Sequence, residues 1–246
     1  SRSRDEAIPA CIMAGCDMIL FNKDIREDYS FIRQALLDGR LTTERLNEAV
    51  LRILAMKAAM KLPEKKKSGS LVPDQSALFD ISCKEHKDWA AQCADEAVTL
   101  VKDTQKLLPL SPDKYKKVRL YYIEDRVDGG FKDGESQITV FKELLEKEGF
   151  VVSVYDYNQP DFYEMFEAGV SYVQNKFDLA IYVACIDTAS NQSVRRIDWA
   201  HIMAADAPWF VNEIPVLFIS VANPYHLIDV PMVKTYINAY TPTKEV

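Results

Sequence analysis

The segment DLAIYVACI, residues 178–186, is apolar at every position after Asp178. Alternation of apolar and polar residues is typical of a strand with one face in water, whereas a short continuous apolar run is typical of a strand covered on both faces. Polar residues bound the run, since Asp178 begins it and Asp187 follows it. The segment therefore predicts a central strand of a buried, mostly parallel sheet.

Apolar runs on both sides of this segment alternate with stretches of helical periodicity. The other predicted strands are residues 98–101, 118–123, 151–155, 215–221 and 235–240. The predicted helices are residues 82–96, 138–148 and 161–175, with a short one at 198–205. Strands that are apolar throughout and alternate with helices indicate a parallel sheet with helices on both faces. We therefore expect residues 76–246 to form a doubly wound α/β domain.

The beginning of the chain has a different organisation, in which helical patterns dominate. Residues 5–14 predict a helix, and the apolar run 17–21 predicts a short strand. Residues 24–38 predict an amphipathic helix that stops at Gly39, and Thr42 has the character of an N-cap for a longer helix. Residues 1–62 are thus predicted to form a helix–strand–helix–helix unit.

A segment of low periodicity separates the two parts. Pro63 is predicted to end the long helix, and the sequence PEKKKSGSLVPDQ, residues 63–75, is rich in Pro, Lys, Ser and Gly. This composition is typical of an interdomain linker. We therefore place the domain boundary there.

The charge of the chain limits its partners. The sequence has 37 Asp and Glu against 30 Lys and Arg, which gives a formal net charge of −7. Binding to nucleic acid needs a clustered basic face, so this balance argues against a nucleic-acid partner. No apolar run reaches the length of about 18 residues that a membrane-spanning helix needs, so we expect no membrane span.

Motifs for cofactors, metals and common hydrolytic sites are missing from the sequence. The loop EDRVDGGFKDGES, residues 124–136, lies between a predicted strand and a predicted helix, where a phosphate would bind. Its glycines do not match G-x-G-x-x-G, and its acidic residues would repel a phosphate. The histidines occur singly, without zinc or serine-hydrolase patterns. We therefore expect no cofactor and no metal.

One polar loop is a candidate for ligand binding. Residues 187–198, DTASNQSVRRID, directly follow the apolar strand, and ligands of open α/β sheets bind beyond the carboxyl ends of strands. Asn191, Gln192, Arg195 and Arg196 offer donors that suit sugar hydroxyls or carbonyls, so these residues are the candidate substrate contacts. The alternative is an ordinary surface or interface loop.

Several ordered segments resemble glycoside hydrolase family 3. AGCDMILF (residues 14–21) is similar to the A-G-x-D-M segment in the late part of that family's catalytic barrel. LLDGRLTTERLNEAVLRILAMKAAMKL (36–62) is similar to the helical segment that follows it there. AVTLVKDTQKLLPL (97–110) resembles the entry to the C-terminal α/β sandwich, with Asp103 where Asn is common. ISVANPYHLID (219–229) resembles a strand of that sandwich with its Asn-Pro-Tyr turn.

The resemblance implies a retaining glycosidase whose chemistry lies elsewhere. The family's nucleophilic Asp lies upstream of the A-G-x-D-M segment, so no catalytic residue is expected in this chain, and Asp17 is not the nucleophile. The acid/base is a His upstream in the N-acetylglucosaminidase branch and a Glu of the C-terminal domain in the β-glucosidase branch. We expect a fragment, truncated at both ends, of a β-N-acetylhexosaminidase-like enzyme that hydrolyses terminal β-linked N-acetylglucosamine or related sugars.

This interpretation makes the chain an accessory part of a larger enzyme. Its expected partners are the missing barrel and, through the parent enzyme, a carbohydrate, and the exposed remnant of the barrel could mediate self-association. Two alternatives stay open: the β-glucosidase branch of the same family, and a non-catalytic module that binds glycan or is purely structural. A flavodoxin-like nucleotide or flavin binder is disfavoured by the acidic glycine-containing loop.

Overall fold

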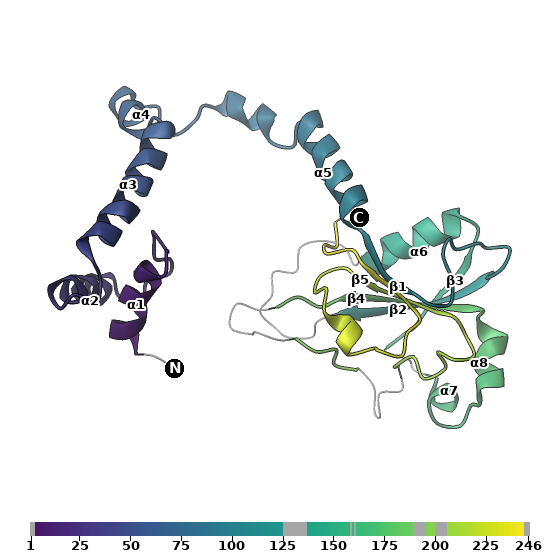
Figure 1. Cartoon of the computed structure of the whole chain (residues 1–246). Coiled ribbons are helices and arrows are strands. Elements are labelled where there is room, and N and C mark those ends of the chain that lie inside the picture. Colours follow the sequence, from purple (N-terminus) through teal and green to yellow (C-terminus); the bar gives the residue numbers. More distant parts are fainter. Residues whose placement is uncertain are drawn as a thin grey trace. The chain divides into compact units, whose positions relative to one another are not determined.

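The computed structural model describes residues 3–124, 137–157, 159, 161–188, 195–199 and 206–243. The chain divides into two compact units, Ser1–Ile81 and Ser82–Val246, each of which has its own set of elements (Figure 1).

The first unit is helical. Its elements are α1 (Arg4–Met13), α2 (Ile25–Leu37), α3 (Thr43–Ala59), α4 (Leu62–Ser68) and the 3-10 helix η1 (Gln75–Asp80). Side-chain caps start two of the helices, because Asp24 accepts hydrogen bonds from the amides of α2 and Thr42 accepts one from the amide of Arg45. Gly39, at φ +80°, ends α2 as predicted. A small core joins Ile12 of α1, Ala35 of α2 and Leu41, which lies between α2 and α3.

Residues 17–21, predicted as a strand, are not part of a strand. A strand is stable only when its backbone groups pair with a neighbour, and no segment of the described chain pairs with this one. Ile19 instead packs against the small core, while Phe21 has a positive φ of 57°. Met18, Leu20 and Phe21 are exposed, so the prediction of a buried strand was wrong for this run.

The predicted linker 63–75 is partly helical. The long helix α3 ends at Ala59, before Pro63, and Pro63 lies in the first turn of α4. Proline is tolerated there because the first amides of a helix have no partner within it. Gly69, at φ +73°, ends α4.

The second unit is built on one six-stranded sheet with the order β1-β6-β5-β4-β2-β3. Its strands are β1 (Thr99–Asp103), β2 (Lys117–Glu124), β3 (Val151–Val154), β4 (Leu179–Cys185), β5 (Val216–Ser220) and β6 (Thr235–Asn238). All neighbouring pairs are parallel except β1 with β6, which is antiparallel. This arrangement confirms the predicted mostly parallel α/β fold, with DLAIYVACI as a central strand.

The antiparallel edge joins the first strand of the sheet to the last one described. Thr99 of β1 lies opposite Asn238 of β6, and Asp103 lies opposite Thr235. The Thr235 hydroxyl donates a hydrogen bond of 2.7 Å to Asp103, and the same carboxylate accepts from the amide of Leu107 at 2.9 Å. The edge is thus fixed by side chains as well as by the ladder.

Both faces of the sheet are covered, as predicted. On one face of the sheet lies α6 (Gln137–Lys147) (Figure 1). Its Ile138, Phe141 and Leu145 pack on a cluster that includes Val118, Leu179 and Leu217. On the other face, α8 (Val170–Lys176) and residues 206–214 pack on a second cluster that includes Tyr121, Tyr182 and Phe218. The unit also contains α5 (Lys84–Ala97) and the 3-10 helix η3 (His226–Ile228).

The predicted helix 161–175 is interrupted. It forms two helices, α7 (Phe162–Phe166) and α8, which are separated at residues 167–169. The amides of Glu167 and Ala168 both bond to the carbonyl of Tyr163, which closes the first helix, and Gly169 then has an extended backbone and caps the second. The short helix predicted at 198–205 falls largely outside the described residues.

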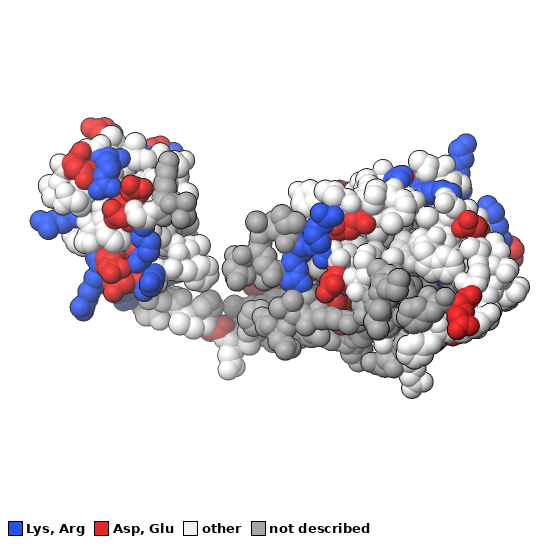
Figure 2. All heavy atoms as spheres, turned by 90° about the horizontal axis from the view of Figure 1, so that it is seen from below, with Lys and Arg blue, Asp and Glu red and all other residues white. Residues whose placement is uncertain are grey.

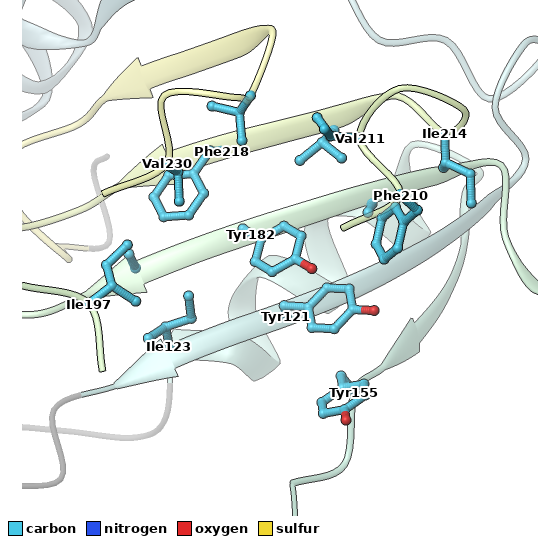
Figure 3. Packing of buried hydrophobic residues seen from close by; sticks show 14 of the residues in the cluster. Tyr121, Ile123, Tyr155, Tyr182, Ile197, Phe210, Val211, Ile214, Phe218 and Val230 are labelled. Atoms are coloured by element: carbon cyan, nitrogen blue, oxygen red, sulfur yellow. The ribbon is translucent and has the colours of Figure 1, made fainter. Parts of the chain in front are cut away.

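A row of aromatic side chains crosses the second face of the sheet. Tyr121, Tyr182, Phe218 and Tyr236 lie opposite one another on β2, β4, β5 and β6. The rings of Tyr121 and Tyr182, which Figure 3 shows side by side, stack at 4.2 Å between centroids. Those of Phe218 and Tyr236 stack at 5.5 Å. This aromatic row therefore crosses four neighbouring strands of the sheet.

Candidate functional site

The carboxyl edge of the sheet brings together segments that are distant in the sequence. The parallel strands β4, β5 and β6 end at Cys185, Ser220 and Asn238, and parallel strands end at one edge. The described part of the loop after β4 and the turn after β5 both begin there. This edge is where ligands bind in open α/β sheets, so it is the candidate site.

The Asn-Pro-Tyr turn after β5 is fixed by side-chain hydrogen bonds. The Ser220 hydroxyl donates to the carbonyl of Asn223, and the Asn223 side chain accepts from the amide of Tyr225 at 3.0 Å. The amide group of Asn238 on β6 donates to the carbonyl of Pro224 at 3.2 Å. The turn is therefore tied both to its own strand and to the neighbouring one. The short helix η3 starts from this fixed point.

Asp229, which follows η3, connects the turn to the loop after β4. Its carboxylate accepts a hydrogen bond from the amide of Ile197 at 3.2 Å and another from Nε of Arg196. The third partner is Nδ1 of His226 at 3.3 Å. The Asp229 side chain is only 7% exposed, whereas that of Arg196 is 62% exposed. A nearly buried carboxylate thus holds an exposed cation in place.

His226, which contacts this carboxylate, is fully buried. The contact at Nδ1 favours the tautomer in which Nδ1–H donates to Asp229 and Nε2 is an acceptor. Among the described residues no hydrogen-bond partner reaches Nε2. A bare acceptor is a smaller penalty than a bare N–H donor, so this tautomer fits the surroundings.

The structure describes only part of the predicted ligand loop. Arg195 is half-buried and Arg196 is exposed, and both lie at the carboxyl edge, whereas Asn191 and Gln192 lie outside the described residues. The acidic loop 124–136 also lies outside them beyond Glu124. Sequence reasoning missed Asp229 and His226. Their spacing of three residues directly after the Asn-Pro-Tyr turn was the signal available in the sequence.

The buried tyrosines on this face of the sheet have a structural role rather than a role in acid–base chemistry. The Tyr182 hydroxyl donates to the carbonyl of Asp206 at 2.9 Å. Burial raises the pKa of Tyr155 to about 12 and that of Tyr236 to about 12, and it raises the pKa of Tyr121 further. These phenols stay protonated near neutral pH, so they cannot serve as general bases.

Asp17, in the first unit, takes part in an ion-pair network. Its carboxylate contacts Nη2 of Arg45 at 2.7 Å and Nη1 of Arg52 at 3.3 Å. The hydrogen bond from Arg45 is the main reason that the pKa of Asp17 lies below its usual value, and the charge of Arg52 acts in the same direction. Nε of Arg45 also donates to the carbonyl of Ile12 at 2.8 Å. Arg45 therefore ties α3 to α1, and Asp17, which follows α1, holds Arg45 in place, which is a structural role.

The charged side chains of the described residues do not indicate a second functional site. On the face that Figure 2 shows, acidic and basic side chains are interspersed over the described parts of both units. Within the described ranges no cluster of His, Cys, Asp or Glu is suited to hold a metal ion. No helix in that same part of the chain is long and apolar enough to cross a membrane.

Comparisons with known proteins identify the family. No family model matches the chain. Over 241 residues the chain is 38% identical to a protein of Cellulomonas fimi described as "Beta-N-acetylglucosaminidase/beta-glucosidase", a match that covers 96% of this chain and 41% of the relative. A solved structure described as "Beta-glucoside phosphorylase BglX" bound to 2FGlc is 44% identical, with a TM-score of 0.73, and the match covers 99% of this chain and 42% of that one. The chain belongs to glycoside hydrolase family 3.

The family 3 fold extends to more distant structures. A glycoside hydrolase family 3 β-N-acetylglucosaminidase from Paenibacillus sp. str. FPU-7 matches 98% of this chain with a TM-score of 0.53 at 20% identity, which supports the fold alone. The chain spans about two fifths of the length of the family 3 relatives that match it. The α/β unit that carries the carboxyl edge lies within the part of these relatives that the chain matches.

Proposed function

We propose that this chain is the C-terminal part of a retaining family 3 enzyme that acts on terminal β-linked N-acetylglucosamine or glucose. The observation that carries the proposal is the match over nearly the whole chain to a protein whose name includes both activities. The match covers 41% of that relative, so catalytic groups can lie in the remainder.

The proposed role of the chain follows from its residues. In a retaining enzyme a carboxylate attacks the anomeric carbon, and a second group protonates the leaving oxygen. The family resemblance implies that the nucleophilic Asp lies before the A-G-x-D-M segment. Asp17, within that segment, is engaged with Arg45 and Arg52. The chain therefore supplies support and substrate contacts rather than the nucleophile.

The proposed substrate contacts lie at the carboxyl edge of the sheet. Arg195 and Arg196 would bind oxygens of the sugar, together with Asn191 and Gln192 of the same loop. The position of the two arginines after β4 and the fixed contact of Arg196 with Asp229 support this assignment. Binding energy from such remote contacts mainly lowers KM when they are made equally in the ground state and the transition state.

A second candidate reaction is phosphorolysis. The relative with 44% identity is described as a β-glucoside phosphorylase. In that reaction a phosphate oxygen, instead of water, attacks the anomeric carbon of the glycosyl-enzyme, and the bond to the nucleophile breaks to give a sugar 1-phosphate. Hydrolysis gives the free sugar, so the products distinguish the two reactions.

The test is an assay of the full-length protein that contains this chain. It is incubated with p-nitrophenyl β-N-acetylglucosaminide and with the β-glucoside, each with and without inorganic phosphate, and the sugar products are identified. Turnover of either glycoside supports the proposal, and the ratio of the two kcat/KM values assigns the branch. Formation of a sugar 1-phosphate that depends on phosphate supports phosphorolysis. No turnover of either glycoside, with or without phosphate, would contradict the proposed function.

A further inference from the structure

Two segments at the carboxyl edge are anchored side by side in one core. Ile197, in the loop after β4, and Val230, after η3, are both buried members of the cluster that contains Ile123 and Phe218 (Figure 3). Arg196 directly precedes Ile197, and Asp229 directly precedes Val230. The contact between Arg196 and Asp229 therefore joins two points whose backbones are already fixed by buried neighbours.

Asp229 acts on both the backbone and the side chain of the loop. One carboxylate oxygen accepts from the Ile197 amide at 3.2 Å, and the other accepts from Nε of Arg196. Nδ1 of the fully buried His226 contacts the first oxygen at 3.3 Å, which limits rotation of the carboxylate. The carboxylate thus fixes the direction in which the loop presents its arginine.

The guanidinium of Arg196 is only partly used by this contact. Nε is bonded to Asp229, while no partner for Nη1 or Nη2 is found among the described residues. These two groups carry four of the five N–H donors of an arginine. They form a planar fork that suits a pair of oxygen acceptors, and its orientation is set before any ligand arrives.

We propose that Asp229 is a positioning residue, and that it presents the Nη edge of Arg196 to an oxygen-rich ligand. Resting on the proposed function, the ligand is either the sugar of the glycoside or an inorganic phosphate, both of which offer pairs of oxygen acceptors. Asp229 does not touch the ligand, since its oxygens are engaged by Ile197, Arg196 and His226. Asp229 therefore affects ligand binding only through the orientation of Arg196.

The first measurement does not depend on any enzymatic activity. The Nε–H proton of Arg196 is observed by NMR in this chain, in the wild type and in Asp229→Asn. The neutral amide of Asn cannot hold Nε as the carboxylate does, so the proton should exchange with water at least about tenfold faster in the variant. Exposed Glu213 provides the matched control, and Glu213→Gln should leave the exchange unchanged. Equal exchange in the wild type and Asp229→Asn would overturn the positioning role, whether or not the protein acts on sugars.

The second measurement is a double-mutant cycle in the full-length protein. Arg196→Gln and Asp229→Asn should each raise one KM by about tenfold with kcat within about twofold, and the double variant should resemble Arg196→Gln alone. A rise in the KM for the glycoside would identify the sugar as the ligand of Arg196. A rise in the KM for phosphate would identify phosphate as that ligand. Additive effects, or loss of kcat without a change in either KM, would show that Asp229 does not act through Arg196. If the full-length protein turns over no glycoside, the proposed function fails, and the exchange measurement still decides the positioning role.

Discussion

Tyr121 and Tyr182 lie opposite each other on β2 and β4, with their rings stacked at 4.2 Å between centroids and 1° between planes. Tyr182 is fully buried and bonds the carbonyl of Asp206 through its hydroxyl. The stacked pair therefore links two central strands to the segment that covers them. Its contribution to stability can be separated into a polar and an apolar part.

Tyr182→Phe removes the hydroxyl and keeps the ring. We expect a loss of about 1 to 2 kcal/mol in the free energy of unfolding, because the Asp206 carbonyl loses its buried donor. Tyr182→Ala should cost about 3 to 5 kcal/mol, since it also leaves a cavity. Urea unfolding measures both. Tyr225→Phe, at a residue that is 71% exposed, is the control and should stay within about 0.5 kcal/mol of the wild type.

Asp161 should make stability depend on pH in the acid range. A hydrogen bond from Lys176, at 2.6 Å, is the main cause that lowers the pKa of Asp161 to about 2 from its ordinary value of 3.8. Because the folded pKa is the lower one, the stabilisation is present above pH 4 and is lost as the pH falls from about 4 to about 2.

The variant Asp161→Asn isolates this charge, because Asn can still cap α7. The wild type should be more stable than Asp161→Asn at pH 6, and the two curves should converge near pH 2. Thermal unfolding at several pH values measures the difference. Asp113→Asn, at an exposed position, is the control. A difference between the wild type and Asp161→Asn that does not change with pH would refute the linkage.

Asp17 should prove to be structural rather than catalytic. In the full-length protein, Asp17→Asn should keep kcat within about tenfold of the wild type, whereas loss of a nucleophile costs many orders of magnitude. The variant should also weaken the link between α1 and α3, so amides of α1 should exchange faster with deuterium. A collapse of kcat with unchanged exchange in α1 would assign Asp17 to the chemistry.

The 246-residue chain alone should not hydrolyse aryl β-N-acetylglucosaminides or β-glucosides. The expectation follows from the proposed location of the nucleophile, before the A-G-x-D-M segment. The measurement is release of p-nitrophenol by the purified chain, compared with a mock preparation. Turnover that is removed by Asp17→Asn would place the nucleophile in this chain and contradict the proposal.

The first unit should promote self-association of the chain. Its helix α3 exposes Leu51 at 67% and Leu54 at 55%, and exposed apolar side chains on one helix favour contact between molecules. Leu51→Lys combined with Leu54→Lys should lower the average mass measured by sedimentation at high concentration. Glu44→Lys, at an exposed position of the same helix, is the charge control. A wild-type chain that stays monomeric at all concentrations would contradict the prediction.

The sequence predicted the sheet better than it predicted the site. The run at 178–186 is apolar throughout because β4 has a strand on each side and is covered on both faces, so its pattern reports its surroundings directly. The run 17–21 has the same character, but a strand also depends on neighbours that a local pattern cannot supply. Periodicity alone also did not reveal the break between α7 and α8, where Gly169 interrupts the helix.

The contacts of the candidate site could be predicted only in part, because they join residues that are distant in the sequence. Arg196 could be selected as a candidate because polar loops after parallel strands often bind ligands. Its partner Asp229 lies 33 residues further along the chain, and only the parallel pairing of β4 with β5 brings the two together. The spacing of His226 and Asp229 after the Asn-Pro-Tyr turn can be seen in the sequence, but it does not show that the carboxylate is buried or that it contacts Arg196. The role of Asp229 becomes visible only when the topology is known.

The pairing of β1 with β6 has a consequence for how the second unit forms during synthesis. Asp103 and Thr235 are 132 residues apart, and everything between them must emerge from the ribosome before the hydrogen bond that joins them can close. Until then β6 is missing from the sheet, and the edges of β1 and β5 that it will occupy are open to other chains. Nascent molecules that stop short of Thr235 should therefore be dependent on chaperones and sensitive to proteases. The unit should become resistant only when this last described strand has been added.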